Sequence, residues 1–304
     1  MAELVREIEK EDIAEIKKLL NKVFGISEFV DIKRLGGMMN HSYKVTLENG
    51  EEFLVRIPGE GTDEMINRID EKKSTELACK LGIDSELLYF DEKGYKIMRF
   101  IKNPQPMNED VMKREDIIKQ AANIFSKLHN SLVDTGVIFD VFEKALLYEK
   151  IISDYQVSLY DDYSDTRSYV FDLYKGLQDK SEINIVPCHN DSLVDNWVLD
   201  EDDRLYLIDW EFSGMNDAVW DLSCLSIEAN YSDVEDNILL KSYYQRNITD
   251  DERKHFIIEK ILIDYLWTLW GLARVPFDGD FMREYASGRY ERLHDNIKQY
   301  KKIK

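Results

Sequence analysis

The 304-residue sequence is poor in cysteine, with only Cys79, Cys188 and Cys224. The three lie far apart and form no C-x-x-C pair. Their odd number and wide spacing argue against a disulfide framework and against a zinc knuckle. Free cysteines in this pattern are typical of a reducing compartment, so we expect a cytoplasmic protein.

The sequence also lacks a long apolar run that is free of charge. Its most apolar late segment, residues 256–273, is interrupted by Glu259, Lys260 and Asp264. Such a segment is too polar to span a bilayer. The first twenty residues carry charges throughout, which predicts an amphipathic helix and not a signal peptide. We therefore expect no membrane insertion.

Basic residues are scarce relative to acidic ones. There are 40 Lys and Arg against 60 Asp and Glu, which gives a formal net charge of −20. A surface of this sign repels nucleic-acid phosphates, so we expect no nucleic-acid partner. It would attract a cationic substrate, although many soluble proteins are acidic without that reason. A hydrophobic fraction of 44% indicates a globular and not a disordered chain.

The distribution of strand and helix patterns predicts two domains. Alternating apolar residues on both sides of an Asn-Gly turn at 49–50 predict a β-hairpin. Pro104 and Pro106 mark the clearest break, and helical spacing dominates after it. We expect an α+β chain with a small sheet-rich domain at 1–102 and a larger, mainly helical domain at 103–304.

Polar residues gather in the stretch CHNDSLVDNWVL and at the end of LYLIDWEF. Asn196 and Asp209 offer the hard oxygen atoms that magnesium prefers. Asp191 lies five residues before Asn196 and could accept a proton from a hydroxyl on the other side of the same loop. Protein-kinase-like phosphotransferases use this arrangement. The alternative is that these residues only cap turns at the ends of a hairpin.

The two stretches CHNDSLVDN and LIDWEFSGMNDAVWDLS resemble the choline/ethanolamine kinase family, within the aminoglycoside phosphotransferase superfamily. Among its members, the chain is most similar to bacterial choline kinases, from about Leu35 to Arg274. The resemblance implies a protein-kinase-like bilobal fold, with an N-terminal β-sheet lobe that binds nucleotide and a helical C-terminal lobe. It also implies transfer of the γ-phosphate of ATP to a small-molecule hydroxyl with the help of Mg²⁺.

Matching the motif residue by residue assigns roles in the catalytic loop. The resemblance makes Asp191 the catalytic base or hydroxyl-orienting residue, and makes Asn196 and Asp209 the magnesium ligands. His189 is expected to shape the loop. Asp221, in VWDLS, matches a residue that braces the loop from behind, so we expect it to have a structural role.

The same resemblance assigns the nucleotide site to the front domain. The stretch GGMMNHSY is similar to the family's nucleotide loop, which places Asn40 and Ser42 near the phosphates. Arg56 occupies the position of the phosphate-binding lysine of protein kinases and can fork onto phosphate oxygens. It needs a carboxylate partner, for which Glu71 is the family-like choice and Glu76 the alternative.

Two further assignments rest on the resemblance alone. Backbone groups between Arg99 and Ile101 are expected to pair with the adenine base. Glu211, two residues after Asp209, is expected to support the magnesium ligands without binding the metal itself.

The back domain carries the features expected of a site for a cationic alcohol. Trp267 and Trp270 are three residues apart on one predicted helix, and Trp faces attract quaternary ammonium groups. The alternative is that both indoles are ordinary core residues. By resemblance, Glu228 faces the choline cation, while Phe212 and Tyr231 form further walls of the pocket.

Choline suits these features because its trimethylammonium head has no N–H donor and needs ring faces more than hydrogen-bond acceptors. A kinase of the same fold acting on ethanolamine, thiamine or an aminoglycoside remains an alternative. A second alternative is a non-catalytic, cation-binding pseudokinase, although the catalytic and metal-binding positions are all present. A protein kinase is disfavoured, because the sequence contains no G-x-G-x-x-G loop and no A-P-E-like segment.

Overall fold

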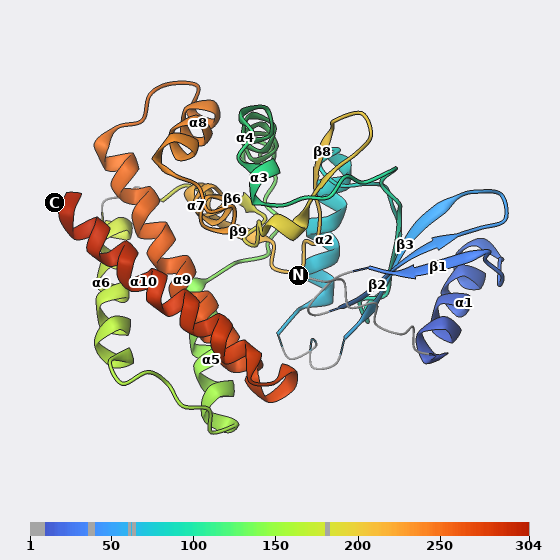
Figure 1. Ribbon diagram of the computed structural model, residues 1–304. Coiled ribbons are helices and arrows are strands. Elements are labelled where there is room, and N and C mark those ends of the chain that lie inside the picture. Colours follow the sequence, from blue (N-terminus) through green and yellow to red (C-terminus); the bar gives the residue numbers. More distant parts are fainter. Residues whose placement is uncertain (1–9, 36–39, 60–61, 63–64, 180–182, 304) are drawn as a thin grey trace. The chain divides into compact units, whose positions relative to one another are not determined.

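The computed structural model describes residues 10–35, 40–59, 62, 65–179 and 183–303 (Figure 1). Within these ranges, a five-stranded sheet with two helices is followed by a mainly helical part that contains two short strand pairs. This arrangement confirms the predicted α+β fold class, with the main sheet in the first third of the sequence.

The described residues form two compact units. Unit 1 comprises the residues up to Gln105 together with Val198–Glu211, and unit 2 comprises Pro106–Trp197 and the residues from Phe212 onward. The sequence predicted a single boundary after residue 102. The chain instead returns to unit 1 for a second, shorter segment, so a single cut does not describe the division.

Unit 1 is built on an antiparallel sheet whose strand order is β1-β2-β3-β5-β4. The predicted hairpin at 49–50 joins β2 to β3, and Gly50 adopts a φ of 82° there, a value that glycine reaches without a steric cost. The strands are β1 (Asp31–Arg34), β2 (Asn40–Thr46), β3 (Glu52–Pro58), β4 (Leu87–Phe90) and β5 (Lys96–Arg99).

Two helices complete the N-terminal part of unit 1. Helix α1 (Lys10–Phe24) buries Ile16 and Leu20 in a core that includes the inward-facing residues of β2 and β3. The sequence predicted an amphipathic helix in the first twenty residues, of which residues 1–9 lie outside the described ranges. Helix α2 (Arg68–Lys80) starts at Asn67, whose side chain accepts hydrogen bonds from two backbone N–H groups of the first turn.

A short hairpin returns the chain to unit 1. It consists of β7 (Trp197–Leu199) and β8 (Leu205–Leu207). The N–H of Gln105 donates to the carbonyl of Leu199 over 2.8 Å, and the N–H of Leu207 donates to the carbonyl of Ile83 over 3.2 Å. These backbone contacts join segments about a hundred residues apart in sequence, and they attach the hairpin to unit 1.

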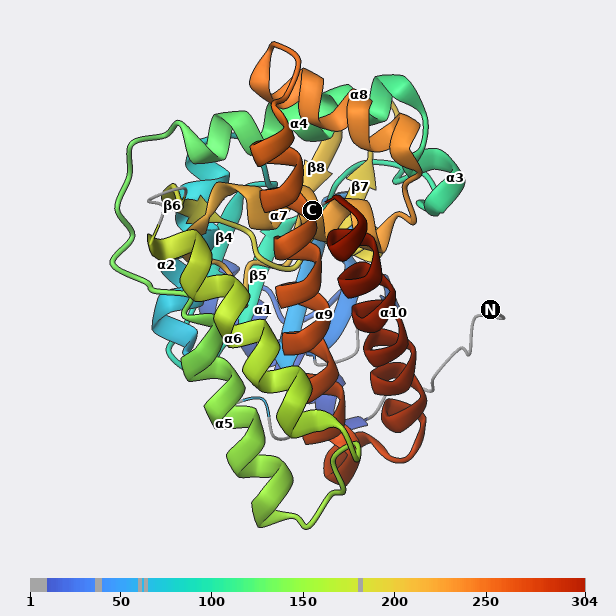
Figure 2. The same ribbon diagram turned by 90° about the vertical axis from the view of Figure 1, so that its left-hand side faces the viewer.

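The described residues of unit 2 form a group of helices (Figure 2) and one antiparallel strand pair, β6 and β9, which is labelled in Figure 1. Helix α9 lies among the others and packs against α5, α6, α7 and α10. The elements are α3 (Glu109–Met112), α4 (Glu115–His129), α5 (Val141–Asp154), α6 (Tyr163–Asp179), β6 (Ile185–Cys188), β9 (Gly214–Asp217), α7 (Ala218–Glu228), α8 (Asp233–Tyr244), α9 (Asp250–Asp278) and α10 (Phe281–Ile303).

Helix α9 is buried on nearly every side because neighbouring helices surround it. It begins with a capping box in which Thr249 and Glu252 satisfy each other's backbone N–H groups. Gly279 ends the helix with a φ of 97°. Among the described helices, including this one, none combines the length and the apolar character needed to cross a membrane.

Gly271 allows α9 and α10 to approach closely, which generates a stability prediction. A Cβ atom at this position would lie 2.8 Å from the ring of Tyr285 and 3.1 Å from the Cβ of Ala286. We expect Gly271→Ala to lower the free energy of unfolding by about 1–2 kcal/mol, because overpacking outweighs the gain in helix propensity. Gly288→Ala is the control: an added Cβ there meets no atom within 4 Å. Chemical denaturation should show unchanged or higher stability for the control; equal stabilities of the two variants would contradict the prediction.

Candidate active site

The polar loop between β6 and β7 is held from behind by the buried carboxylate of Asp221 in α7. The backbone N–H of His189 donates to Asp221 Oδ2 over 2.8 Å, and that of Asn190 donates to Oδ1 over 2.7 Å. The imidazole Nε2 of His129, in α4, lies 3.0 Å from the same Oδ2. These contacts confirm the prediction that Asp221 braces the loop.

Asn190 holds the loop in a conformation that few residues adopt. Its φ of 70° is in the left-handed region, which asparagine tolerates better than most non-glycine residues. Its amide donates to the carbonyl of Phe212 over 3.0 Å and accepts from the amide of Asn216 over 2.9 Å. The indole N–H of Trp220 donates to its carbonyl over 2.9 Å. Because so many contacts fix Asn190, the loop presents the following residue in one conformation.

Asp191, His189 and Asn196 lie together in unit 2. The side-chain nitrogen of Asn196 donates to the backbone carbonyl of Asp191 over 2.7 Å and lies 3.4 Å from its carboxylate. The N–H of Asp191 donates to His189 Nδ1 over 3.3 Å, so the imidazole proton resides on Nε2. With its nitrogen directed at Asp191, Asn196 keeps its amide oxygen as the atom suited to binding a cation.

In unit 1, Arg56 of β3 pairs with a carboxylate of α2. Its Nη1 lies 2.5 Å from Glu71 Oε1, and its Nη2 donates to the carbonyl of Gly94 over 3.1 Å. Of the two candidate partners, the structure therefore selects Glu71, which is buried, whereas Glu76 is exposed. Arg56 Nη1 also lies 3.6 Å from Asp209 Oδ1.

Arg68, which the sequence analysis missed, links Glu71 to Glu211. Its Nη1 donates to Glu71 over 2.8 Å and to Glu211 over 3.3 Å, and its Nη2 donates to Asn40 Oδ1 over 3.3 Å. The amide of Asn40 in turn donates to Glu211 over 2.8 Å. The signal for Arg68 was its position three residues before Glu71, which places both on one helix face.

Lys96 is a third buried cation of this cluster that the sequence analysis missed. It lies opposite Arg56 in the β3–β5 register, and its Nζ is 3.5 Å from Glu71 Oε1. Burial alone would raise the pKa of Glu71, but the neighbouring Arg56, Lys96 and Arg68 lower it to about 2. Burial raises the pKa of Glu211 to about 7, and the charges of Asp209 and Glu71 add to the rise.

Asp209 is the carboxylate of unit 1 with capacity for a further partner. Among the described residues, its Oδ1 has no hydrogen-bond partner although that atom is buried. Its backbone adopts a φ of 65°, a strained conformation for aspartate. A hard carboxylate oxygen without a hydrogen bond fits a magnesium ligand, and so does the amide oxygen of Asn196.

The remaining predictions for the nucleotide site concern the Gly-Gly loop, Ser42 and the backbone from Arg99 to Ile101. Residues 36–39 of the predicted nucleotide loop lie outside the described ranges, while Ser42 lies opposite Arg56 in the β2–β3 register. The N–H of Arg99 donates to the carbonyl of Glu86 over 2.8 Å, so it is already used within the protein. The pairing of the other backbone groups between Arg99 and Ile101 with adenine stays a prediction.

Four aromatic rings gather in unit 2. The centroids of Trp267 and Trp270 are 5.9 Å apart, and Phe212 lies 5.1 Å from Trp267 in an edge-to-face contact. Tyr285 of α10, which the sequence analysis missed, lies 5.6 Å from Trp270. The structure thus brings three of the predicted acceptor residues together. Both indole N–H groups are buried without a hydrogen-bond partner among the described residues.

Charged residues of unit 2 act on the ring of Tyr285. Burial raises the pKa of Tyr285; Arg289 opposes this rise, whereas the carboxylates of Glu228 and Asp191 add to it. Asp191 and the four rings all belong to unit 2.

Glu228, which the resemblance expects to face the choline cation, already has an arginine partner in unit 2, and its contact with the cation stays a prediction. Arg289 of α10 forms a two-point ion pair with it, in which Nη2 donates to Oε2 over 3.0 Å. Arg289 was invisible in the sequence because it lies 61 residues further on. Tyr231 donates its hydroxyl to the carbonyl of Met112 over 2.7 Å, so its polar end faces α3. Its role as a pocket wall stays a prediction.

Comparisons with known proteins agree with this geometry. A model of the choline/ethanolamine kinase family matches residues 32–266. The protein LicA of Haemophilus influenzae strain Rd is 30% identical over 254 residues, which cover 80% of this chain and 92% of LicA. The solved choline kinase LicA of Streptococcus pneumoniae superimposes with a TM-score of 0.82 at 30% identity, covering 96% of this chain and all of that one. A LicA structure in complex with AMP gives a TM-score of 0.79 at 31% identity, covering 94% and 98%.

The bracing of the loop by Asp221 predicts a specific loss of stability. We expect Asp221→Asn to lower the free energy of unfolding by at least about 2 kcal/mol, because an amide nitrogen cannot accept from the buried N–H groups that the carboxylate now satisfies. Asp195→Asn changes an exposed residue of the same loop and should stay within about 0.5 kcal/mol. Denaturation curves for both variants test this; a stable Asp221→Asn protein would exclude the bracing role.

The raised pKa of Glu211 predicts a pH-dependent gain in stability on substitution. Because its folded-state pKa of about 7 exceeds the ordinary 4.5, ionising Glu211 opposes folding increasingly as the pH rises from about 5 to 8. Glu211→Gln removes this cost, so we expect little change at pH 5 and a gain of about 1–3 kcal/mol at pH 8. The exposed Glu48→Gln should show no such trend. A Glu211→Gln effect that is constant with pH would refute the interpretation.

Proposed function

Because the chain belongs to the choline/ethanolamine kinase family, we propose that it transfers the γ-phosphate of ATP to the hydroxyl of choline, which gives phosphocholine and ADP. Membership of the family makes it a phosphotransferase with an alcohol group as acceptor. The observation that supports the choice of acceptor is a group of four aromatic rings, three of them buried, in the same unit as the loop that carries Asp191.

Asp191 is proposed to accept or orient the hydroxyl proton of the acceptor. The left-handed Asn190 and the bracing carboxylate of Asp221 fix the backbone on one side of it, and Asn196 holds it on the other. A base held in one conformation needs no reorganisation when the reaction occurs, and this kind of positioning supplies much of the acceleration in phosphoryl transfer.

We propose that the charged cluster of unit 1 meets the phosphates of ATP. Arg56 is positioned by Glu71, and a guanidinium held in this way neutralises negative charge without losing its own. Asn196 and Asp209 are the proposed magnesium ligands, since each offers an oxygen suited to a hard cation. When bound, Mg²⁺ would neutralise charge on the phosphate oxygens.

The trimethylammonium head of choline is proposed to contact the faces of Trp267, Trp270 and Tyr285. Glu228 is already neutralised by Arg289, so recognition of the cation falls mainly on ring faces and on the nearby Asp191 charge. Two buried indole N–H groups that have no hydrogen-bond partner in the described part of the chain are typical of a site that a ligand or water completes. Ethanolamine has N–H donors and would require more hydrogen-bond acceptors than such rings provide.

An acceptor panel tests the proposal. ADP release, measured with ATP, Mg²⁺ and choline, ethanolamine, thiamine or an aminoglycoside in turn, should give the highest kcat/KM for choline. Higher kcat/KM with another acceptor would identify a different kinase of the same fold. Choline binding measured by calorimetry without ADP release would identify the pseudokinase.

The proposed role of Asp191 predicts a large loss of turnover on its removal. Asp191→Ala should lower kcat at least about 100-fold, because the hydroxyl loses the group that orients and deprotonates it. Asp195→Ala, an exposed carboxylate in the same loop, should keep near-normal turnover. An Asp191→Ala enzyme with near-normal kcat would reject the assignment while leaving the acceptor preference open to the panel.

A further inference from the structure

A second polar cluster, separate from the proposed catalytic residues, lies where α7 meets α9. It consists of Asp217, His255 and Glu259, which are 3%, 5% and 2% exposed. His255 and Glu259 are four residues apart on one face of α9, and Asp217 immediately precedes α7. One potential ligand atom from each side chain lies within 4.8 Å of the other two.

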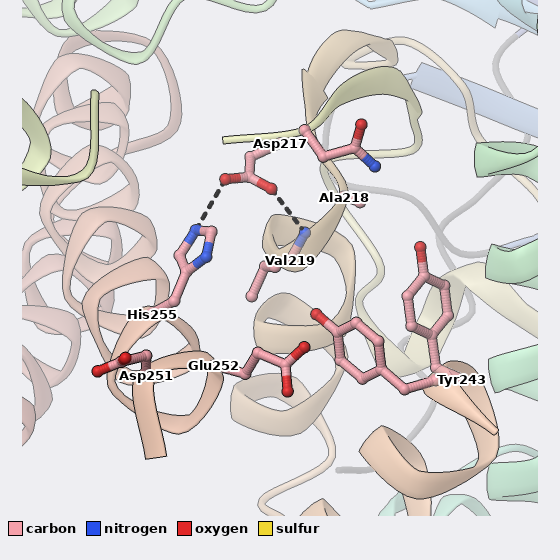
Figure 3. Close-up of a pocket in the computed structure, with 9 residues that line it drawn as sticks. Asp217, Ala218, Val219, Tyr243, Asp251, Glu252 and His255 are labelled. Carbon is pink, nitrogen blue, oxygen red and sulfur yellow. Dashed lines mark hydrogen bonds and ion pairs between the residues drawn. The ribbon is translucent and has the colours of Figure 1, made fainter. Parts of the chain in front are cut away.

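The contacts inside this cluster bring one ring nitrogen and two carboxylate oxygens together. His255 Nε2 forms an ion pair with Asp217 Oδ2 over 2.8 Å (Figure 3), and it lies 3.4 Å from Glu259 Oε1. The ring N–H is poorly directed at the Asp217 oxygen, since the pair does not meet the geometry of a hydrogen bond. The same three atoms would serve as ligands of one ion once the imidazole has lost its proton.

The charge of the cluster also favours a cation. An imidazolium and two carboxylates would leave one net negative charge among three buried side chains. A divalent ion with a neutral imidazole and two carboxylates would make the sum zero, and the imidazole proton would pass to solvent.

Access for an ion is provided by a cavity of about 260 Å³ that Asp217 and His255 line, together with Tyr243, Asp251 and Glu252 (Figure 3). This volume holds several water molecules, since one water occupies about 30 Å³. A second group of three possible ligands, His129, Cys188 and Asp221, differs because both oxygens of its carboxylate already accept backbone N–H groups.

We propose that Asp217, His255 and Glu259 bind a divalent transition-metal ion of the zinc class, with cavity water completing the coordination. One imidazole nitrogen and two carboxylate oxygens are accepted ligands of zinc, which often binds three protein side chains and a water. The ion would tie the start of α7, four residues before the bracing Asp221, to the helix that carries Trp267 and Trp270. It would thus stabilise the scaffold of unit 2 and take no part in phosphoryl transfer.

Calorimetric titration with zinc chloride tests the proposal. The parent protein for this experiment is the full chain with Asp209→Asn, kept in excess Mg²⁺. Zinc uptake by this protein therefore cannot be explained by binding at the proposed magnesium position. We expect one zinc equivalent with a Kd in the micromolar range or tighter, and a rise in the thermal midpoint on zinc addition. Co²⁺ should give the visible absorption of a four-coordinate site. No uptake by this parent protein would overturn the proposal.

Two near-isosteric variants and one control locate the binding site. Asp217→Asn keeps the oxygen that accepts the N–H of Val219 but loses the second carboxylate oxygen, and Glu259→Gln keeps its volume. Each substitution should weaken zinc binding at least tenfold and abolish the Co²⁺ spectrum. A cooperative thermal transition in EDTA should show that each variant protein is still folded. Glu284→Gln, at an exposed position of α10, should bind as the parent does. Undiminished binding in both ligand variants would show that the three residues form only an ion triad.

Discussion

The catalytic loop of this chain depends on one buried carboxylate, that of Asp221. A carboxylate with no exposed surface is costly to bury unless hydrogen bonds replace its water, and here two backbone N–H groups and an imidazole do so. One of these bonds, together with the side-chain contacts of Asn190, holds Asn190 in its left-handed conformation. The cost of burying the charge and the strain of the loop are thus met by one set of contacts, which fixes the position of Asp191.

Neighbouring charges also distinguish two carboxylates of unit 1, those of Glu71 and Asp209. Glu71 is surrounded by Arg56, Arg68 and Lys96, so it is firmly ionised and positions the guanidinium groups. Among the residues that the structure describes, Asp209 has one ion-pair partner, Arg56, and one carboxylate oxygen without a hydrogen bond. The two side chains carry the same functional group, yet their neighbours make one a structural anion and leave the other suited to a metal. Electrostatic preorganisation of this kind is a major source of catalytic power in kinases.

Under the proposed function, unit 2 would separate the recognition of a cation from the placement of charge. Glu228 is paired with Arg289, so aromatic faces and the loop carboxylate would supply most of the attraction that an organic cation needs. Three of the four rings lie on α9 and α10, whose close approach at Gly271 depends on the absence of a side chain. The cluster at Asp217 lies on the same helix but towards its start, so the proposed metal would act on the scaffold and not on the reacting groups.

The sequence alone was sufficient for features that depend on short spacing. The hairpin at 49–50, the spacing of Asp191 and Asn196 in one loop, and the pair of indoles three residues apart all follow from local geometry. Tertiary structure decided the rest, because it joins residues that lie far apart along the chain. The capture of Glu228 by Arg289, the ring of Tyr285 beside Trp270 and the return of residues 198–211 to unit 1 each depend on packing and register. Sequence spacing does not encode such contacts, since many partners of equal chemistry are available until the fold brings one of them within reach.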